Sequence, residues 1–131
     1  MRYLVDTHVL LWSFFEPERL SEPIQAILLE EETEIYYSPV SLWEISIKYG
    51  LKKLSLHGLT PEDFFAALDT SYYICTEIRP LDAISAYRLP PHHKDPFNRF
   101  LIWEAIRNDF TLLSVDRAAD AYTKEGLKIV R

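Results

Sequence analysis

The sequence predicts an α/β fold, a mainly parallel sheet of four to five strands flanked by helices. Short apolar runs, such as residues 3–5 and 111–115, are too short for helices and fit buried strands. Signals that start helices follow these runs, so strands alternate with helices throughout. With 131 residues, 48% of them hydrophobic, the chain can bury a proper core. These observations favour a parallel sheet covered on both faces.

Each expected helix begins where an N-cap side chain or a proline occurs, since both suit the first helical turn. These starts are Asp6-Thr7, Ser21-Glu22-Pro23, Ser38-Pro39, Thr60-Pro61, Pro80 and Asp95-Pro96. The helices are expected to end near Phe15, the acidic run Glu30-Glu31-Glu32, Gly50, Asp69, Tyr87 and Asn108. The strands are expected at residues 3–5, 35–37, 72–75, 111–115 and 127–130.

We expect a single domain over residues 1–131, because the one proline-rich interruption, residues 89–96, is too short for a linker. No segment has the length needed to cross a bilayer. Asp6 stands where a signal peptide would still need its apolar run, so we expect a cytoplasmic protein. The single cysteine, Cys75, excludes an intramolecular disulfide framework and a multi-cysteine zinc site.

The charge balance argues against a nucleic-acid binder with a basic surface. There are 14 basic and 20 acidic residues, a formal net charge of −6. Two of the acids directly follow expected strands, Asp6 after residues 3–5 and Asp116 after residues 111–115. Each can be read as a helix cap. Together they point to the carboxyl edge of the sheet, where open α/β folds bind ligands.

Two of the expected helices carry further polar residues. Taking 100° per residue, Val40, Trp43, Ile47 and Leu51 share an apolar face, and Glu44 lies on its shoulder. Such a carboxylate needs a partner, which a metal ion or Lys48 can provide. In the helix after Pro96, Asn98 lies within the stripe expected to be buried, facing either a loop backbone or the acidic pocket. Asp95 is sufficiently explained as the N-cap.

Converging carboxylates repel one another unless a cation holds them. Ligands that are all oxygen suit Mg²⁺ or Mn²⁺ better than zinc. Such ions commonly serve phosphoryl transfer, by binding a phosphate oxygen and lowering the pKa of an attacking water. His92 and His93 could also bind metal, but adjacent imidazoles in a proline-rich loop are more often exposed.

Four blocks of the sequence resemble PIN-domain proteins, and more narrowly the VapC-type toxins of prokaryotic toxin–antitoxin pairs. In order, the blocks are Leu4-Val5-Asp6-Thr7-His8-Val9-Leu10-Leu11-Trp12, Ser41-Leu42-Trp43-Glu44-Ile45-Ser46-Ile47-Lys48, Leu89-Pro90-Pro91-His92-His93-Lys94-Asp95-Pro96-Phe97-Asn98-Arg99 and Leu112-Leu113-Ser114-Val115-Asp116. The resemblance implies a Rossmann-like fold and a ribonuclease with an acidic pocket for a divalent metal. It also implies a cognate antitoxin that masks the acids, and a homodimer.

The resemblance implies roles for individual residues. Asp6 and Asp116 would be metal ligands, and Glu44 would be a carboxylate that supports these ligands without touching the ion, or one that binds a second metal. Ser114 would hold a water at the metal, and Thr7 would orient Asp6. Asn98 departs from the family, which usually has aspartate there. An amide can offer an oxygen but no charge, and Asp95 can take over as the acid.

The main hypothesis is therefore an endoribonuclease that uses Mg²⁺ or Mn²⁺, held by Asp6, Asp95, Asn98 and Asp116, to activate water for attack on RNA. In it, Glu44 holds a second ion or accepts the proton of the water. The alternative is a catalytically weakened PIN domain that binds RNA or a partner, which Asn98 favours. A receiver domain is disfavoured because it needs paired acids after its first strand, and a haloacid-dehalogenase-type phosphatase because it needs Asp-x-Asp there.

Lys48, Lys94 and Arg99 are candidates for phosphate contacts, although each can equally be a solvated or paired charge. The net charge of −6 takes on another meaning under the main hypothesis. Part of it is a cluster of acids that divalent cations would neutralise, turning a repulsive pocket into one that binds phosphate. RNA binding is then expected to depend on the metal.

Overall fold

A parallel five-stranded sheet forms the centre of the computed structural model, which describes residues 1–131. The strand order is β3-β2-β1-β4-β5, and every pair of neighbours is parallel. The strands are β1 (Arg2–Val5), β2 (Glu34–Tyr37), β3 (Ile74–Cys75), β4 (Thr111–Leu113) and β5 (Lys128–Val130). The predicted α/β class and its parallel sheet are confirmed.

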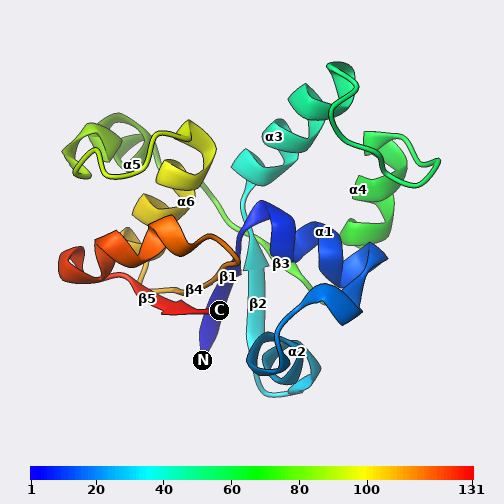
Figure 1. Cartoon of the computed structure of the whole chain (residues 1–131), viewed down its shortest axis with the longest axis horizontal. Helices are drawn as coiled ribbons and strands as arrows, with labels where there is room; N and C mark the ends of the chain where they lie inside the picture. Colours follow the sequence, from blue (N-terminus) through cyan, green and yellow to red (C-terminus); the bar gives the residue numbers. More distant parts are fainter.

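The helices connect the strands and flank the sheet (Figure 1). They are α1 (Thr7–Phe15), α2 (Glu22–Leu29), α3 (Pro39–Gly50), α4 (Pro61–Asp69), α5 (Pro80–Ser85) and α6 (Pro96–Arg107). Three 3₁₀ segments were not predicted: η1 (Pro17–Arg19), η2 (Ala86–Arg88) and η3 (Arg117–Glu125). None of the helices combines the length and apolar character that crossing a bilayer requires.

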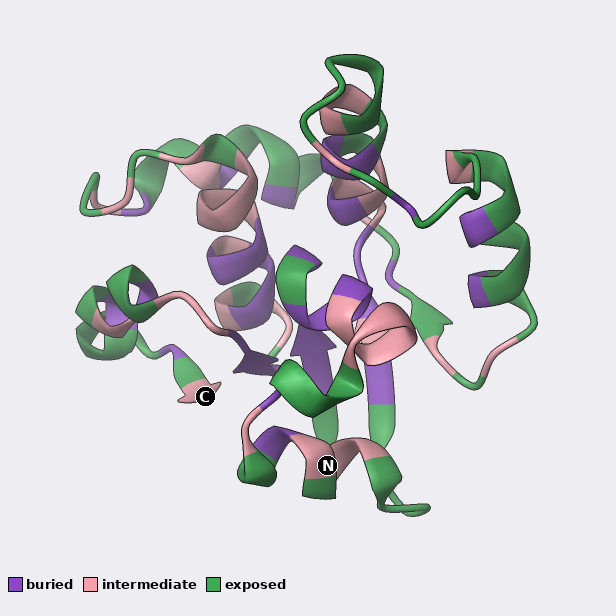
Figure 2. Ribbon diagram, turned by 45° about the vertical axis from the view of Figure 1, so that its right-hand side comes forward, coloured by how far each residue is buried: buried purple, intermediate pink, exposed green.

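Two hydrophobic clusters pack against opposite faces of the sheet, since alternate side chains of a strand point to opposite sides. In β1, Tyr3 and Val5 belong to the cluster formed with α1, α2 and α4, whereas Leu4 belongs to the cluster formed with α6 and η3. The strands at the centre of the sheet are accordingly mostly buried (Figure 2). Residues that follow β1 and β4 are thereby held in fixed positions at the carboxyl edge.

The strand order changes direction at β1. From β1 the chain moves outward to β2 and β3, then crosses back to add β4 and β5 on the other side. In open α/β sheets such a switch point opens a crevice beyond the carboxyl ends of the strands. Here it lies between β1 and β4, which are paired from Tyr3–Thr111 to Val5–Leu113.

The orientation of α3 differs from the expectation. Its buried residues are Ser41, Glu44 and Ile45, while Trp43 is 61% exposed and Leu51, just beyond the helix, is also exposed. The helix therefore turns its polar edge, rather than the stripe through Trp43, toward the molecule. The reason is that Glu44 has polar partners inside, described below, which offset the cost of burying a carboxylate.

Candidate functional site

Asp6 lies at the end of β1 and caps α1. Its Oδ1 accepts the backbone N–H of Val9 at 2.8 Å. Its Oδ2 accepts the hydroxyl of Ser114 at 2.6 Å and the backbone N–H of Val115 at 3.2 Å. Burial raises the pKa of this carboxyl, and the hydrogen bond from Ser114 opposes the rise. All the hydrogen-bond donors are neutral, so Asp6 is a buried acid with no ion-pair partner.

Ser114 connects Asp6 to the second acid, Asp116. While its hydroxyl donates to Asp6, the same oxygen accepts the backbone N–H of Asp116 at 3.0 Å. Asp116 in turn caps η3, because its Oδ1 accepts the N–H of Ala118 at 3.0 Å. The two acids that follow β1 and β4 are thus brought together at the switch point, as their positions in the sequence predicted.

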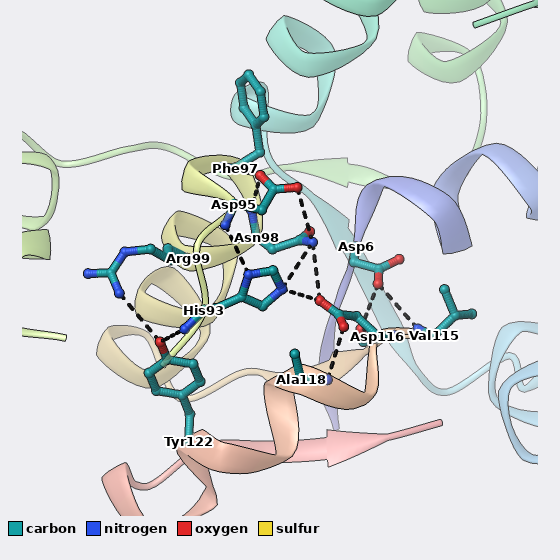
Figure 3. A network of polar contacts seen from close by, with 11 residues as sticks. Asp6, His93, Asp95, Phe97, Asn98, Arg99, Val115, Asp116, Ala118 and Tyr122 are labelled. Atoms are coloured by element: carbon teal, nitrogen blue, oxygen red, sulfur yellow. Dashed lines mark hydrogen bonds and ion pairs between the residues drawn. The ribbon is translucent and has the colours of Figure 1, made fainter. Parts of the chain in front are cut away.

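The N-terminus of α6 reaches Asp116 from the other side (Figure 3). Asp95 caps this helix, with its Oδ1 accepting the N–H of Phe97 at 2.8 Å. The side-chain nitrogen of Asn98 donates to Asp116 Oδ2 at 3.2 Å and lies 3.5 Å from Asp95 Oδ2. Asn98 therefore faces the acidic pocket, with its amide nitrogen toward the acids in this structure.

Glu44 forms a separate buried group with residues of α1 and α3. Its Oε1 accepts the hydroxyl of Thr7 at 2.6 Å, and its Oε2 forms an ion pair with Lys48 Nζ at 2.5 Å. Thr7 also lies 3.0 Å from the Ser41 hydroxyl. The side chain of Thr7 thus orients Glu44 and not Asp6, although it follows Asp6 in the chain. Lys48, one of the two partners considered for Glu44, thus forms an ion pair with it.

Arg99 is occupied at the loop that precedes α6. Its guanidinium donates to the carbonyl oxygens of Leu89 and Pro90, both at 3.0 Å. It also lies 3.4 Å from the hydroxyl of Tyr122. These contacts hold the proline-rich loop against η3, so the guanidinium of Arg99 is hydrogen-bonded to neutral groups within the chain.

His93 is a site residue that the sequence reasoning did not select. It was expected to be exposed, yet only 12% of its side chain is accessible. Its Nε2 contacts Asp116 Oδ2 and lies 3.5 Å from the Asn98 amide nitrogen. One signal could have found it: His93 stands two residues before the N-cap Asp95, and so at the edge where the acids gather.

The four predicted acids do not form one cluster. Nowhere in the chain do three or more histidine, cysteine or carboxylate side chains come close enough together to hold a metal ion. Asp6, Asn98, Ser114 and Asp116 nevertheless line one small pocket. A carboxylate offers about four acceptor positions. Asp6 and Asp116 each use three, which leaves one on each Oδ1.

The chemistry of this donor set fits a hard divalent cation. The available groups are two carboxylates, a hydroxyl and an amide, and oxygen donors of this kind suit Mg²⁺ or Mn²⁺. A cation there would also supply the charge that the buried carboxylate of Asp6 lacks. For Asn98 to contribute its oxygen, the amide would have to turn over, because its nitrogen faces Asp116.

Solved structures with the same fold include several from bacteria. VapBC2 from Rickettsia felis, bound to a DNA fragment from its promoter, has a TM-score of 0.67 at 16% identity, covering 99% of this chain and 98% of that one. VapBC-1 from nontypeable Haemophilus influenzae has a TM-score of 0.67 at 13% identity, covering 99% and 97%. A toxin–antitoxin complex from Klebsiella pneumoniae has a TM-score of 0.60 at 15% identity, covering 98% and 96%.

The sequence gives an independent comparison. No curated protein is similar enough in sequence to count as a match. The PIN domain family, in contrast, matches residues 3–125, which include all of the acids described above. The chain therefore belongs to the PIN-domain family.

Proposed function

We propose that this PIN domain is a metal-dependent endoribonuclease and the toxin of a toxin–antitoxin module. The observation that carries the proposal is the environment of Asp6. A buried carboxylate with neutral donors only is costly, unless a cation completes the site. Ser114 links Asp6 to Asp116 by hydrogen bonds. Both acids lie at the edge of the sheet where ligands of this fold class bind.

In this proposal, the metal ion is held by four residues at the carboxyl edge of the sheet. Asp6 and Asp116, with Asp95 and Asn98 beside them, would hold the ion, and Ser114 keeps the first two in register. When bound, Mg²⁺ or Mn²⁺ supplies positive charge to a phosphate oxygen and lowers the pKa of a water.

Two residues of α3 complete the proposed machinery. Glu44 would accept the proton of that water or serve a second ion, and Lys48, which is ion-paired with it, is a candidate contact for the RNA phosphate. Because water attacks, and not the 2′-hydroxyl, the products should carry 5′-phosphate and 3′-hydroxyl ends.

We also propose two protein partners for this chain, an antitoxin and a second copy of itself. One similar structure is a toxin–antitoxin complex, which supports an antitoxin as the partner of this chain. A homodimer is also expected, and analytical ultracentrifugation of the purified protein tests it. Sedimentation as a 15.4 kDa monomer at all concentrations would contradict the dimer.

A second function, RNA or partner binding without cleavage, is favoured by one observation. Asn98 brings an amide where an aspartate is usual, and its nitrogen donates to Asp116. The pocket therefore has one negative charge fewer with which to hold a cation. The two functions predict different responses to metal, which one experiment can compare.

The experiment is cleavage of a defined single-stranded RNA with Mn²⁺, with Mg²⁺ and with EDTA, using wild type, Asp6→Asn and Asn98→Asp. The nuclease proposal expects cleavage with metal by wild type, none with EDTA, and none by Asp6→Asn prepared identically. Cleavage by Asn98→Asp alone would support the binding function for the natural chain. Equal cleavage by wild type and Asp6→Asn would contradict the nuclease proposal.

A further inference from the structure

We infer that His93 positions Asp116 by donating the proton on its Nε2, and that it is not itself a metal ligand. The inference rests on the proposed function, in which Asp116 holds the ion. It follows from the hydrogen bonds on the two ring nitrogens and from the way the loop is fastened.

The loop that carries His93 is fixed on several sides. The backbone N–H of His93 donates to the hydroxyl of Tyr122 at 2.8 Å, and this hydroxyl donates to Pro90 O at 2.7 Å. Tyr122 is fully buried, and Arg99 binds the carbonyl oxygens of Leu89 and Pro90. The imidazole is therefore held in place by the protein, and the neighbouring ring of His92 packs against the ring of Tyr122.

The hydrogen bond at Nδ1 shows which ring nitrogen carries the proton. Nδ1 accepts the backbone N–H of Asp95 at 3.0 Å, so it must carry a lone pair. A neutral imidazole has one N–H, and the proton is then on Nε2. Nε2 lies against Asp116 Oδ2, which accepts that proton.

The same reasoning excludes His93 as a ligand in this arrangement. Binding a cation through Nε2 needs a lone pair there, which would put the proton on Nδ1, facing the N–H of Asp95. The ring would have to leave its place. As a hydrogen-bond donor, His93 instead fixes the side chain of Asp116, which is 28% exposed. Asp116 is the residue that caps η3. Asp6, which is nearly fully buried, needs no such support.

The matched test uses two amide variants. Glutamine reaches the position of Nε2 and can donate to Asp116, whereas asparagine reaches only that of Nδ1. We expect His93→Gln to bind Mn²⁺ within about threefold of wild type, and His93→Asn to bind it about 10-fold to 100-fold more weakly, the range for residues that orient metal ligands. Electron paramagnetic resonance of free Mn²⁺ measures the affinity without RNA. His92→Asn, in the same loop, should leave it unchanged.

The tautomer is tested on the wild type, so the result does not depend on the folding of a variant. A long-range ¹H–¹⁵N spectrum of ¹⁵N-histidine-labelled protein, with His93 assigned through His93→Gln, should show Nε2 protonated and Nδ1 bare. A proton on Nδ1 would overturn the inference. So would direct coupling between bound Mn²⁺ and the ¹⁵N of His93, or equal Mn²⁺ affinity of the two amide variants.

Failure of this inference is distinguishable from failure of the proposed function. If wild type binds Mn²⁺ and the two variants differ as expected, but no RNA is cleaved, the positioning holds and the nuclease fails. If RNA is cleaved but the variants bind Mn²⁺ alike, the nuclease holds and the positioning fails. If wild type binds no Mn²⁺, both are overturned.

Discussion

Asp6 and Asp82 are both almost fully buried, yet their surroundings are opposite. Asp82, in α5, forms ion pairs with Arg79 and Arg107 at 3.0 and 3.1 Å. Burial acts to raise its pKa, but the hydrogen bonds from Arg107 and Arg79 outweigh it, and the pKa is lowered. Asp6 has only neutral hydrogen-bond donors, and burial raises its pKa.

Under the proposed function, this difference separates a structural acid, Asp82, from a functional one, Asp6. The charge of Asp82 is compensated within the chain, so the folded protein uses it to tie α5 to α6. The charge of Asp6 is left for something outside the chain to compensate, which is what a cation site requires. Substitutions at the two acids should therefore have opposite effects on stability and on activity.

The largest effect is expected for Asp6→Asn. Cleavage of RNA should fall by on the order of 100-fold or more, beyond the usual range for residues that only orient ligands. Stability should change little, because an amide of the same size removes a buried charge but leaves the backbone N–H of Val9 or of Val115 without its acceptor. Cleavage assays and urea unfolding at pH 7 measure the two effects. A variant that loses both activity and stability would contradict the assignment of Asp6 as a functional acid.

Asp82→Asn should do the reverse. We expect a loss of about 2 kcal/mol in the free energy of unfolding, below the 3–5 kcal/mol of a fully buried pair, because both arginines are partly exposed. Cleavage should be retained. As a control, Asp120→Asn breaks the exposed pair with Arg131 and should cost less than about 1 kcal/mol.

The stability that Asp82 contributes should depend on pH. The pKa of Asp82 is lowered in the folded protein, so the stability it contributes is present above about pH 4 and is lost as the pH falls through the folded pKa. The difference in unfolding free energy between wild type and Asp82→Asn should therefore shrink in acid. A difference that stays constant down to pH 2 would show that ionisation of Asp82 is not the cause.

A smaller effect is expected where Ser114 joins the acids. Ser114→Ala removes the donor to Asp6 and the acceptor for the N–H of Asp116. Affinity for Mn²⁺ should fall about 10-fold, the lower end of the range for residues that orient ligands. The matched control is Ser85→Ala, because the hydroxyl of Ser85 is buried without a partner. Equal affinity of the two variants would contradict a linking role for Ser114.

The sequence was informative about Asp6 and Asp116 because local patterns place both at strand ends. It could not place Asp82, because Arg107 is 25 residues away and only tertiary packing brings the two together. It also misplaced the buried face of α3, where periodicity points to Trp43, while the partners of Glu44 decide which side is buried.

His93 shows the same limit at the candidate site. Nothing in the proline-rich loop indicates which way its ring points. Tyr122, 29 residues further on, fixes its backbone. Contacts of this kind join segments that no spacing relates, so the sequence can place His93 near the acids but cannot predict the contacts that orient its ring.

Another buried acid, Glu104 in α6, can be compared with Asp6 and Asp82. Both of its carboxylate oxygens are buried without a hydrogen-bond partner, as are the hydroxyls of Thr76 and Ser85. Burial raises its pKa, and the neighbouring hydroxyls of Thr76 and Ser38 only partly oppose the rise. A raised pKa means that folding favours the protonated form, so its contribution to stability decreases as the pH rises from about 4.5 through the folded pKa.

Glu104→Gln should therefore stabilise the protein at neutral pH, by about 1 kcal/mol, because the amide imitates the protonated acid and carries no charge to bury. The gain should disappear near pH 4, where the wild type is protonated both folded and unfolded. Urea unfolding of both proteins from pH 4 to pH 8 measures it. A variant less stable than wild type at pH 7 would mean that Glu104 is ionised in the fold and has a partner, which would place it with Asp82. A gain at pH 7 that vanishes in acid would place it with Asp6, as an acid whose charge the chain leaves uncompensated.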